Sequence, residues 1–297
     1  MILLLAAALP TLFWDAPPST ATELRDAGIT TIRVPAERLD DWRSAAVISA
    51  EAAGVKGTIK LLAPAVQYRP NAATASRSPW LDSNGWQFLR YPHARFYYDV
   101  SGPQAALAAA EASCFGGEAL IHTDSAGLKP FAAMLDFLRT LGPNDRPPVA
   151  DIGLIDNGLE DAGEVMNLMV RNNLLFAIVA RPDPRYKITI GPVVPDAENP
   201  ATAAHQIRAR LTDEKRSLRI YGSPVVIGRL TTLPEGVRVH LLNYAGVERK
   251  VNGLRVRVAG RYPKHSRAEL LDYTVESDGT EFTVPELSIY AVVDLTR

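Results

Sequence analysis

The chain has 297 residues, with 32 basic and 33 acidic side chains, and 47% of its residues are hydrophobic. This is the composition of a soluble globular protein, and it excludes a disordered or fibrous chain. A formal net charge of −1 argues against a general nucleic-acid-binding protein, which needs a surplus of Lys and Arg. The single cysteine, Cys114, excludes an intrachain disulfide and a thiolate metal cluster.

The first ten residues, MILLLAAALP, have two interpretations. Their apolar run and small residues are typical of the core of a secretory signal, although no Lys or Arg precedes them. The alternative is a first buried strand. Because residues 11–15 already make a complete strand, we expect residues 1–10 to be a remnant signal segment of a secreted or periplasmic bacterial protein. A cytoplasmic protein is the alternative. No other stretch approaches the ~18 apolar residues of a membrane span.

Residues 11–145 alternate between strand and helix patterns. Strands alternating with helices of this length pair in parallel through right-handed crossovers. Five strands are too few to close an eight-stranded barrel, so we expect an open sheet or a shortened, barrel-like (β/α) domain. The predicted strands are 11–15, 29–34, 55–62, 95–100 and 119–123, and the predicted helices are 20–28, 39–53, 103–115 and 129–141.

The rest of the chain divides at about residue 219. Residues 146–218 continue the α/β pattern, with predicted strands at 149–155, 175–180 and 187–190. Residues 219–297 read as short alternating strands joined by turns such as Asn252-Gly253, which is typical of an antiparallel β-sandwich. The predicted fold class is therefore α/β followed by all-β.

Carboxylates follow three of the predicted parallel strands. Asp15, Asp99 and Asp124 each stand where a strand ends, and parallel α/β folds bind ligands at that edge. Paired carboxylates can divide the acid, base or nucleophile roles of glycoside hydrolysis, so these three are the candidate catalytic residues. The alternative is helix capping, which Asp124-Ser125 fits well.

Residues 64–93 form a stretch of roughly 30 residues without clear periodicity, and loops of that length are functional or disordered. This one is rich in aromatic residues, so we expect it to be ordered. Aromatic faces beside hydrogen-bonding groups suit a sugar, whereas the alternative is that the rings pin the loop to the domain. The candidate substrate-binding residues, including neighbours on the predicted strands, are Trp14, Tyr68, Trp80, Trp86, Tyr98 and Arg95.

Other sequence signals predict neither a metal nor a cofactor. The five histidines are scattered, with no pair at metal-ligand spacing. His122, on a predicted strand, is interpreted as a core histidine. The chain contains neither GxGxxG nor GxxxxGK[ST], so nothing supports nucleotide binding.

The order of the regions resembles a known family. The segments Asp151–Asp156 (DIGLID), Val239–Tyr244 (VHLLNY) and Ile289–Leu295 (IYAVVDL) are similar to those of family 42 beta-galactosidases. The resemblance implies a catalytic barrel, then a glutamine-amidotransferase-like region at 146–218, then a sandwich. That family carries its acid/base residue in an Asn-Glu pair after the fourth barrel strand, and this chain has no Asn-Glu dipeptide. No catalytic residue is therefore carried over from the family.

Two functional hypotheses follow. The first is a non-catalytic or degenerate glycoside-hydrolase-like protein that binds a carbohydrate. The alternative is an active glycoside hydrolase in which Asp99 is the acid or base and Asp15 or Asp124 is its partner.

Overall fold

The structure is a computed structural model that describes residues 9–45, 48–67, 79–142, 146–191 and 199–297. The chain divides into two compact units, Met1–Ala65 with Tyr91–Asp145 (unit 1) and Val66–Arg90 with Arg146–Arg297 (unit 2). Residues 1–8 lie outside the described ranges, so export of the protein stays a prediction. Within those ranges, no helix combines the length and apolar character that crossing a membrane requires.

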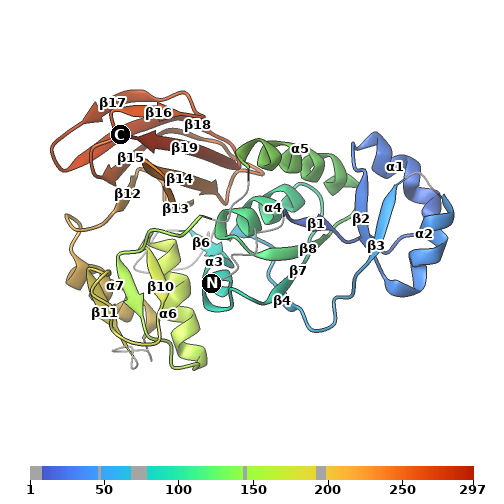
Figure 1. Ribbon diagram of the computed structural model, residues 1–297, viewed down its shortest axis with the longest axis horizontal. Coiled ribbons are helices and arrows are strands. Elements are labelled where there is room, and N and C mark those ends of the chain that lie inside the picture. The colour runs from blue at the N-terminus through green and yellow to red at the C-terminus, as the bar shows by residue number, and fades with distance from the viewer. Residues whose placement is uncertain (1–8, 46–47, 68–78, 143–145, 192–198) are drawn as a thin grey trace. The chain divides into compact units, whose positions relative to one another are not determined.

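The strands of unit 1 all pair in parallel (Figure 1). Strands β1, β8, β7 and β4 form one sheet in that order, β2 pairs with β3, and a parallel bridge between Phe13 and Arg33 joins β1 to β2. The order is thus β3-β2-β1-β8-β7-β4, in which the first and last strands of the unit lie side by side. The bounds are β1 (Thr11–Leu12), β2 (Thr31–Val34), β3 (Ser49–Ala52), β4 (Ile59–Leu61), β7 (Arg95–Asp99) and β8 (Glu118–His122).

Alternation along β7 separates an apolar face from a polar one. Phe96 and Tyr98 are buried, whereas Tyr97 is partly exposed and Asp99 is exposed. Since successive side chains of a strand point to opposite faces, Tyr97 and Asp99 share a face. This alternation places polar groups at the carboxyl end of the sheet without exposing its core.

The helices of unit 1 follow the prediction except at residues 39–53. The predicted helix there is wrong in its second half, because Ser49–Ala52 form a strand that pairs with β2. This is a tertiary contact that local helix propensity does not reveal. The helices are η1 (Pro18–Thr20), α1 (Ala21–Asp26), η2 (Ala36–Arg38), α2 (Leu39–Ala45), α4 (Gln104–Phe115) and α5 (Ser125–Leu141).

Unit 2 begins with a segment that the sequence analysis places in the first region. Residues 66–90 are not simply a loop, since they contain most of β5 (Ala65–Gln67), β6 (Trp80–Asp82) and α3 (Gly85–Arg90). They belong to the same unit as a three-stranded parallel sheet of order β10-β9-β11. Its elements are β9 (Ile152–Leu154), α6 (Glu160–Arg171), β10 (Phe176–Ile178), β11 (Ile188–Ile190) and α7 (Pro200–Leu211).

Two four-stranded antiparallel sheets complete unit 2, which confirms the predicted antiparallel β structure at the C-terminal end of the chain. One sheet has the order β12-β15-β18-β17 and the other β13-β14-β19-β16. The bounds are β12 (Leu218–Tyr221), β13 (Val226–Leu233), β14 (Gly236–Asn243), β15 (Val251–Ala259), β16 (Lys264–Ser266), β17 (Leu271–Val275), β18 (Gly279–Leu287) and β19 (Tyr290–Thr296).

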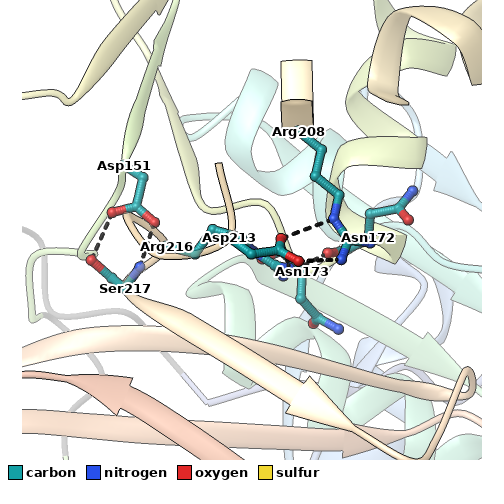
Figure 2. A network of polar contacts seen from close by, with 7 residues as sticks. All are labelled: Asp151, Asn172, Asn173, Arg208, Asp213, Arg216 and Ser217. Atoms are coloured by element: carbon teal, nitrogen blue, oxygen red, sulfur yellow. Dashed lines mark hydrogen bonds and ion pairs between the residues drawn. The ribbon is translucent and has the colours of Figure 1, made fainter. Parts of the chain in front are cut away.

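A buried carboxylate ties the first of these strands to the parallel sheet (Figure 2). Asp151, just before β9, accepts hydrogen bonds from the backbone N and the Oγ of Ser217 at 2.8 and 2.6 Å. Lys187 Nζ forms an ion pair with the same carboxylate at 2.8 Å. These bonds hold the start of β12 at the amino-terminal edge of the parallel strands.

Arg216 makes a second connection at the same edge (Figure 2). Its Nη2 donates to the carbonyls of Asn172 and Asn173 at the end of α6, at 3.0 and 3.1 Å. Its Nη1 donates to Asp213, which also accepts from Arg208 on α7. The network therefore links α6, α7 and the chain leading into β12.

Candidate functional site

A cluster of titratable side chains lies at the carboxyl ends of the parallel strands in unit 1. Asp99 is the last residue of β7, His122 is the last residue of β8, and the two pair in register. Asp15 follows β1, which pairs with β8 on its other side. The carboxyl ends of parallel strands meet at one edge of a sheet, so the topology itself brings these three residues together.

The imidazole of His122 lies between the two carboxylates. Its Nδ1 is 2.9 Å from Asp99 Oδ1, and its Nε2 is 3.3 Å from Asp15 Oδ1. Lys60 Nζ, on β4, is 3.7 Å from Asp99 Oδ2. The side chains of Asp15 and Asp99 are 58% and 47% exposed, so both carboxylates remain accessible to a ligand.

The electrostatics of the cluster keep Asp99 ionised. The hydrogen bond with His122 is the main reason that the pKa of Asp99 is lowered, and Lys60 adds to the effect. Burial, together with the charges of Asp99 and Asp15, raises the pKa of Tyr97 to about 12. The Tyr97 hydroxyl therefore keeps its proton and is a hydrogen-bond donor close to two anionic acceptors.

Aromatic rings lie beneath the charged groups. The rings of Phe13 and Tyr97 pack edge to face with centroids 6.0 Å apart, and the Phe13 ring lies 6.4 Å from the ring of His122. Such pairs hold their side chains in defined orientations. The cluster is thus supported by packed residues of β1 and β7.

Asp124, the third predicted catalytic carboxylate, caps a helix. Its Oδ1 accepts hydrogen bonds from the backbone N of Gly127 at 3.0 Å and of Gly102 at 2.9 Å. It is the N-cap of α5, as the alternative interpretation of the sequence expected. Both bonds end on Oδ1 and give Asp124 a structural role, whereas its predicted catalytic role stays a prediction; the candidate site is built from the residues that contact His122.

Three of the predicted substrate-binding residues lie in unit 1 at positions that do not favour contact with a ligand. Trp14 is 5% exposed and its Nε1 donates to Thr20 Oγ1 at 2.9 Å. Tyr98 is fully buried, and its hydroxyl donates to Glu111 at 2.6 Å. Arg95 opens β7, at the opposite end of the strand from Asp99. The burial of Trp14 and Tyr98 leaves almost no surface for a ligand, and Arg95 lies at the wrong end of its strand.

The predicted tryptophans of the 64–93 stretch pack within unit 2. The guanidinium carbon of Arg171 lies 3.9 Å from the centroid of the Trp80 ring. Trp86 packs against Gly163 of α6 so closely that a Cβ there would be 2.9 Å from the ring. These contacts favour the alternative, in which the aromatic residues hold the segment in place. Tyr68 lies outside the described residues.

His122 is the functional candidate that sequence reasoning missed. As an isolated histidine on a strand it was interpreted as a core residue, whereas its side chain is 27% exposed and contacts two aspartates. The signal lies in the pairing of β7 with β8, which aligns Asp99 with His122. Among the described residues, no group of three or more His, Cys, Asp or Glu is suited to hold a metal ion.

Comparison with known proteins gives a likeness of fold. No protein-family model and no curated protein matches the chain. The alpha-L-fucosidase isoenzyme 2 from Paenibacillus thiaminolyticus superposes with a TM-score of 0.55 and 10% sequence identity, over 88% of this chain and 71% of that one. The fold resembles that of a glycoside hydrolase.

A second similar structure is a catalytic mutant of Gan42B, a GH42 beta-galactosidase from G. stearothermophilus. It superposes with a TM-score of 0.41 and 10% identity, over 97% of this chain, which spans 60% of the length of that enzyme. The likeness to the fucosidase confirms the remote resemblance to glycoside hydrolases that the sequence predicts, at the level of the fold alone.

Proposed function

We propose that this chain is a glycoside-hydrolase-like protein that binds a carbohydrate at the Asp15–His122–Asp99 cluster without hydrolysing it. The observation that carries this proposal is the state of Asp99. Glycoside hydrolysis needs one protonated carboxyl group of raised pKa beside an ionised one. The bond from His122 instead lowers the pKa of Asp99, which favours an acceptor of hydrogen bonds over a proton donor.

The chemistry of the cluster suits sugar hydroxyl groups. Each exposed carboxylate offers acceptor oxygens, while Tyr97 and Lys60 offer donors close by. Hydrogen bonds to ionised groups are stronger than those between neutral groups, so a few of them can position a sugar ring. Lys60 and Tyr97 lie on neighbouring strands of one parallel sheet, and Asp99 and Asp15 lie at the carboxyl ends of its strands β7 and β1.

The fold of unit 1 fits a glycoside-hydrolase-like protein. We infer that unit 1 is a shortened (β/α) barrel, which is supported by a strand order that puts β1 next to β8. The division into residues 11–145, 146–218 and 219–297, and an amidotransferase-like origin of 146–218, stay predictions from the sequence.

The alternative, an active glycoside hydrolase, draws on a different observation. Asp15 and Asp99 contact opposite nitrogens of one imidazole ring. Two carboxyl groups that lie on either side of one imidazole ring are separated by a distance of the order of the roughly 5 to 9.5 Å found between the two carboxyl groups of glycosidases. The assay below decides between the two functions.

The test combines a glycan array, titration calorimetry on the best glycan, and an assay with chromogenic glycosides. We expect the native protein to bind a glycan and to hydrolyse none. Asp99→Asn should weaken binding about tenfold, the cost of losing one hydrogen bond to a charged group. The exposed Asp136→Asn, on α5 of the same unit, is the matched control and should leave binding unchanged. Hydrolysis that Asp99→Asn abolishes would establish the alternative, and no glycan binding by the native protein would contradict the proposal.

A further inference from the structure

A short stretch that follows β15 and contains β16 concentrates positive charge. Residues 260–267, GRYPKHSR, contain Arg261, Lys264, His265 and Arg267 and no acidic residue. All four of these side chains belong to exposed residues. We call residues 260–267 the basic strap. The next acidic residue, Glu269, follows after the strap has ended.

The strap is held in one conformation by hydroxyl groups of the neighbouring sheet. The backbone N of Tyr262 donates to Thr280 Oγ1 at 2.9 Å, and that hydroxyl donates to the carbonyl of Gly260 at 2.9 Å. The Tyr273 hydroxyl donates to the carbonyl of Tyr262. Gly260 has a φ of 108°, which a residue with a side chain rarely adopts. The backbone that carries the charged side chains of the strap is therefore ordered before a ligand binds, which lowers the entropic cost of binding.

Two of the cations in the strap, Arg261 and Lys264, differ from Arg267 in their surroundings. Arg267 and Arg238 both donate to Asp294, at 2.6 and 2.7 Å, so the strap shares this carboxylate with a second guanidinium group. Within the described part of the chain, no ion pair involves Arg261 or Lys264. An anion that approaches the strap would therefore meet Arg261 and Lys264, two exposed cations.

The edge position of the strap limits how a partner can bind. β16 is the last strand of its sheet and pairs only with β19 among the described strands. It is three residues long, with Pro263 before it and Lys264 as its first residue, and these are features that block pairing with a further strand. Recognition would therefore use side chains rather than backbone hydrogen bonds, which argues against an added peptide strand.

We propose that the basic strap binds an anionic polysaccharide, whose carboxylate or sulfate groups contact Arg261, Lys264 and Arg267. Guanidinium groups bind carboxylates and sulfates through paired hydrogen bonds, and Lys adds a point charge. Carbohydrate binding as such rests on the proposed function above, but the strap is a separate surface.

The experiment measures affinity of the full chain for polygalacturonate and for heparin at low and at physiological salt. We expect binding that weakens as salt rises, because bound counterions are released. Arg261→Glu combined with Lys264→Glu should reduce affinity about tenfold or more, and the milder pair Arg261→Gln with Lys264→Gln should reduce it less. Arg249→Glu with Lys250→Glu, two exposed basic residues of the same sandwich, is the matched control and should have little effect. Thermal unfolding verifies that each variant is folded.

The outcomes separate this proposal from the proposed function. Asp99→Asn should keep full affinity for the anionic polymers, and the strap variants should keep full affinity for the array glycan. No binding of either polymer at low salt would overturn the proposal, as would an equal loss in the control variant. Binding of polyglutamate or single-stranded DNA as tightly as the polysaccharides would show a general anion surface and would also overturn it.

Discussion

Asp213 shows how one carboxylate can stabilise two cationic neighbours. It accepts hydrogen bonds from Arg208 at 3.0 and 2.8 Å and from Arg216 at 3.1 Å (Figure 2). Arg216 is only 7% exposed, so its charge needs a partner. The bonds from Arg208, and then those from Arg216, lower the pKa of Asp213 to about 2, against the opposing effect of burial.

We expect Asp213→Asn to lower the free energy of unfolding by about 1 kcal/mol at pH 7, a value reduced by solvent screening because 43% of the Asp213 side chain is exposed. A depressed pKa in the folded state stabilises the protein above the ordinary value of 3.8, and this stabilisation is lost as pH falls through about 2. Urea unfolding between pH 7 and pH 2 measures the difference, which should shrink below about pH 4. Asp136→Asn, in an exposed ion pair, is the control, and an unchanged difference at low pH for Asp213→Asn would contradict the assignment.

Only some residues of the candidate site could be predicted from the sequence. Asp15 and Asp99 were expected at strand ends and lie there, because a polar residue after an apolar run is a local pattern. The role of His122 depends on which strands are neighbours and in what register, and a single sequence does not contain that information. The burial of Tyr98 had a readable cause, since it alternates with Tyr97 and Asp99 along β7.

At the scale of elements, the N-terminus of α5 depends on Asp124. The carboxylate satisfies a backbone donor of its own helix and one of the loop before α4. We expect Asp124→Ala to cost about 1 to 2 kcal/mol of stability, and Asp124→Asn to cost less because Asn also caps helices well. Chemical unfolding measures both values.

Glycan affinity separates capping from catalysis for the same residue. A cap that only orders the helix should leave ligand affinity unchanged in Asp124→Asn, whereas Asp99→Asn should weaken it. If Asp124→Asn is fully stable and yet loses the ligand, Asp124 belongs to the binding site.

Local patterns located most of the elements, and contacts distant in sequence account for the failures. The sandwich strands were predicted because period-2 alternation between turns is a local signal. The helix predicted over 39–53 is wrong at Ser49–Ala52, because these residues pair with a strand that precedes them by many residues. Residues 64–93 read as aperiodic because β6 and α3 are short and owe their stability to packing in unit 2.

At the scale of the whole molecule, the chain enters unit 2, returns to unit 1 and enters unit 2 again. The segment Val66–Arg90 is held in unit 2 by contacts with residues that come later in the chain. Arg90, largely buried, donates to both oxygens of Asp156 at 2.8 and 2.9 Å and to the carbonyl of Leu159. Ser83 donates to Asn167 at 3.1 Å. Residues 79–90 should therefore behave as part of the fold of residues 146–297.

We expect a fragment of residues 146–297 to be stabilised by an added peptide of residues 79–90. A ligand that binds only the folded state stabilises it by about 2.7 kcal/mol at a hundredfold excess over its Kd, so the unfolding temperature should rise with peptide concentration. Arg90→Met in the peptide removes the partner of a largely buried Asp156, and Trp86→Ala removes the ring that packs on Gly163. Both peptides should therefore fail. A peptide with Gln87→Ala, which leaves these contacts intact, is the control and should stabilise the fragment. An unfolding temperature that the native peptide does not change would show that unit 2 folds without this segment, and the division of the chain would have to be redrawn at residue 146.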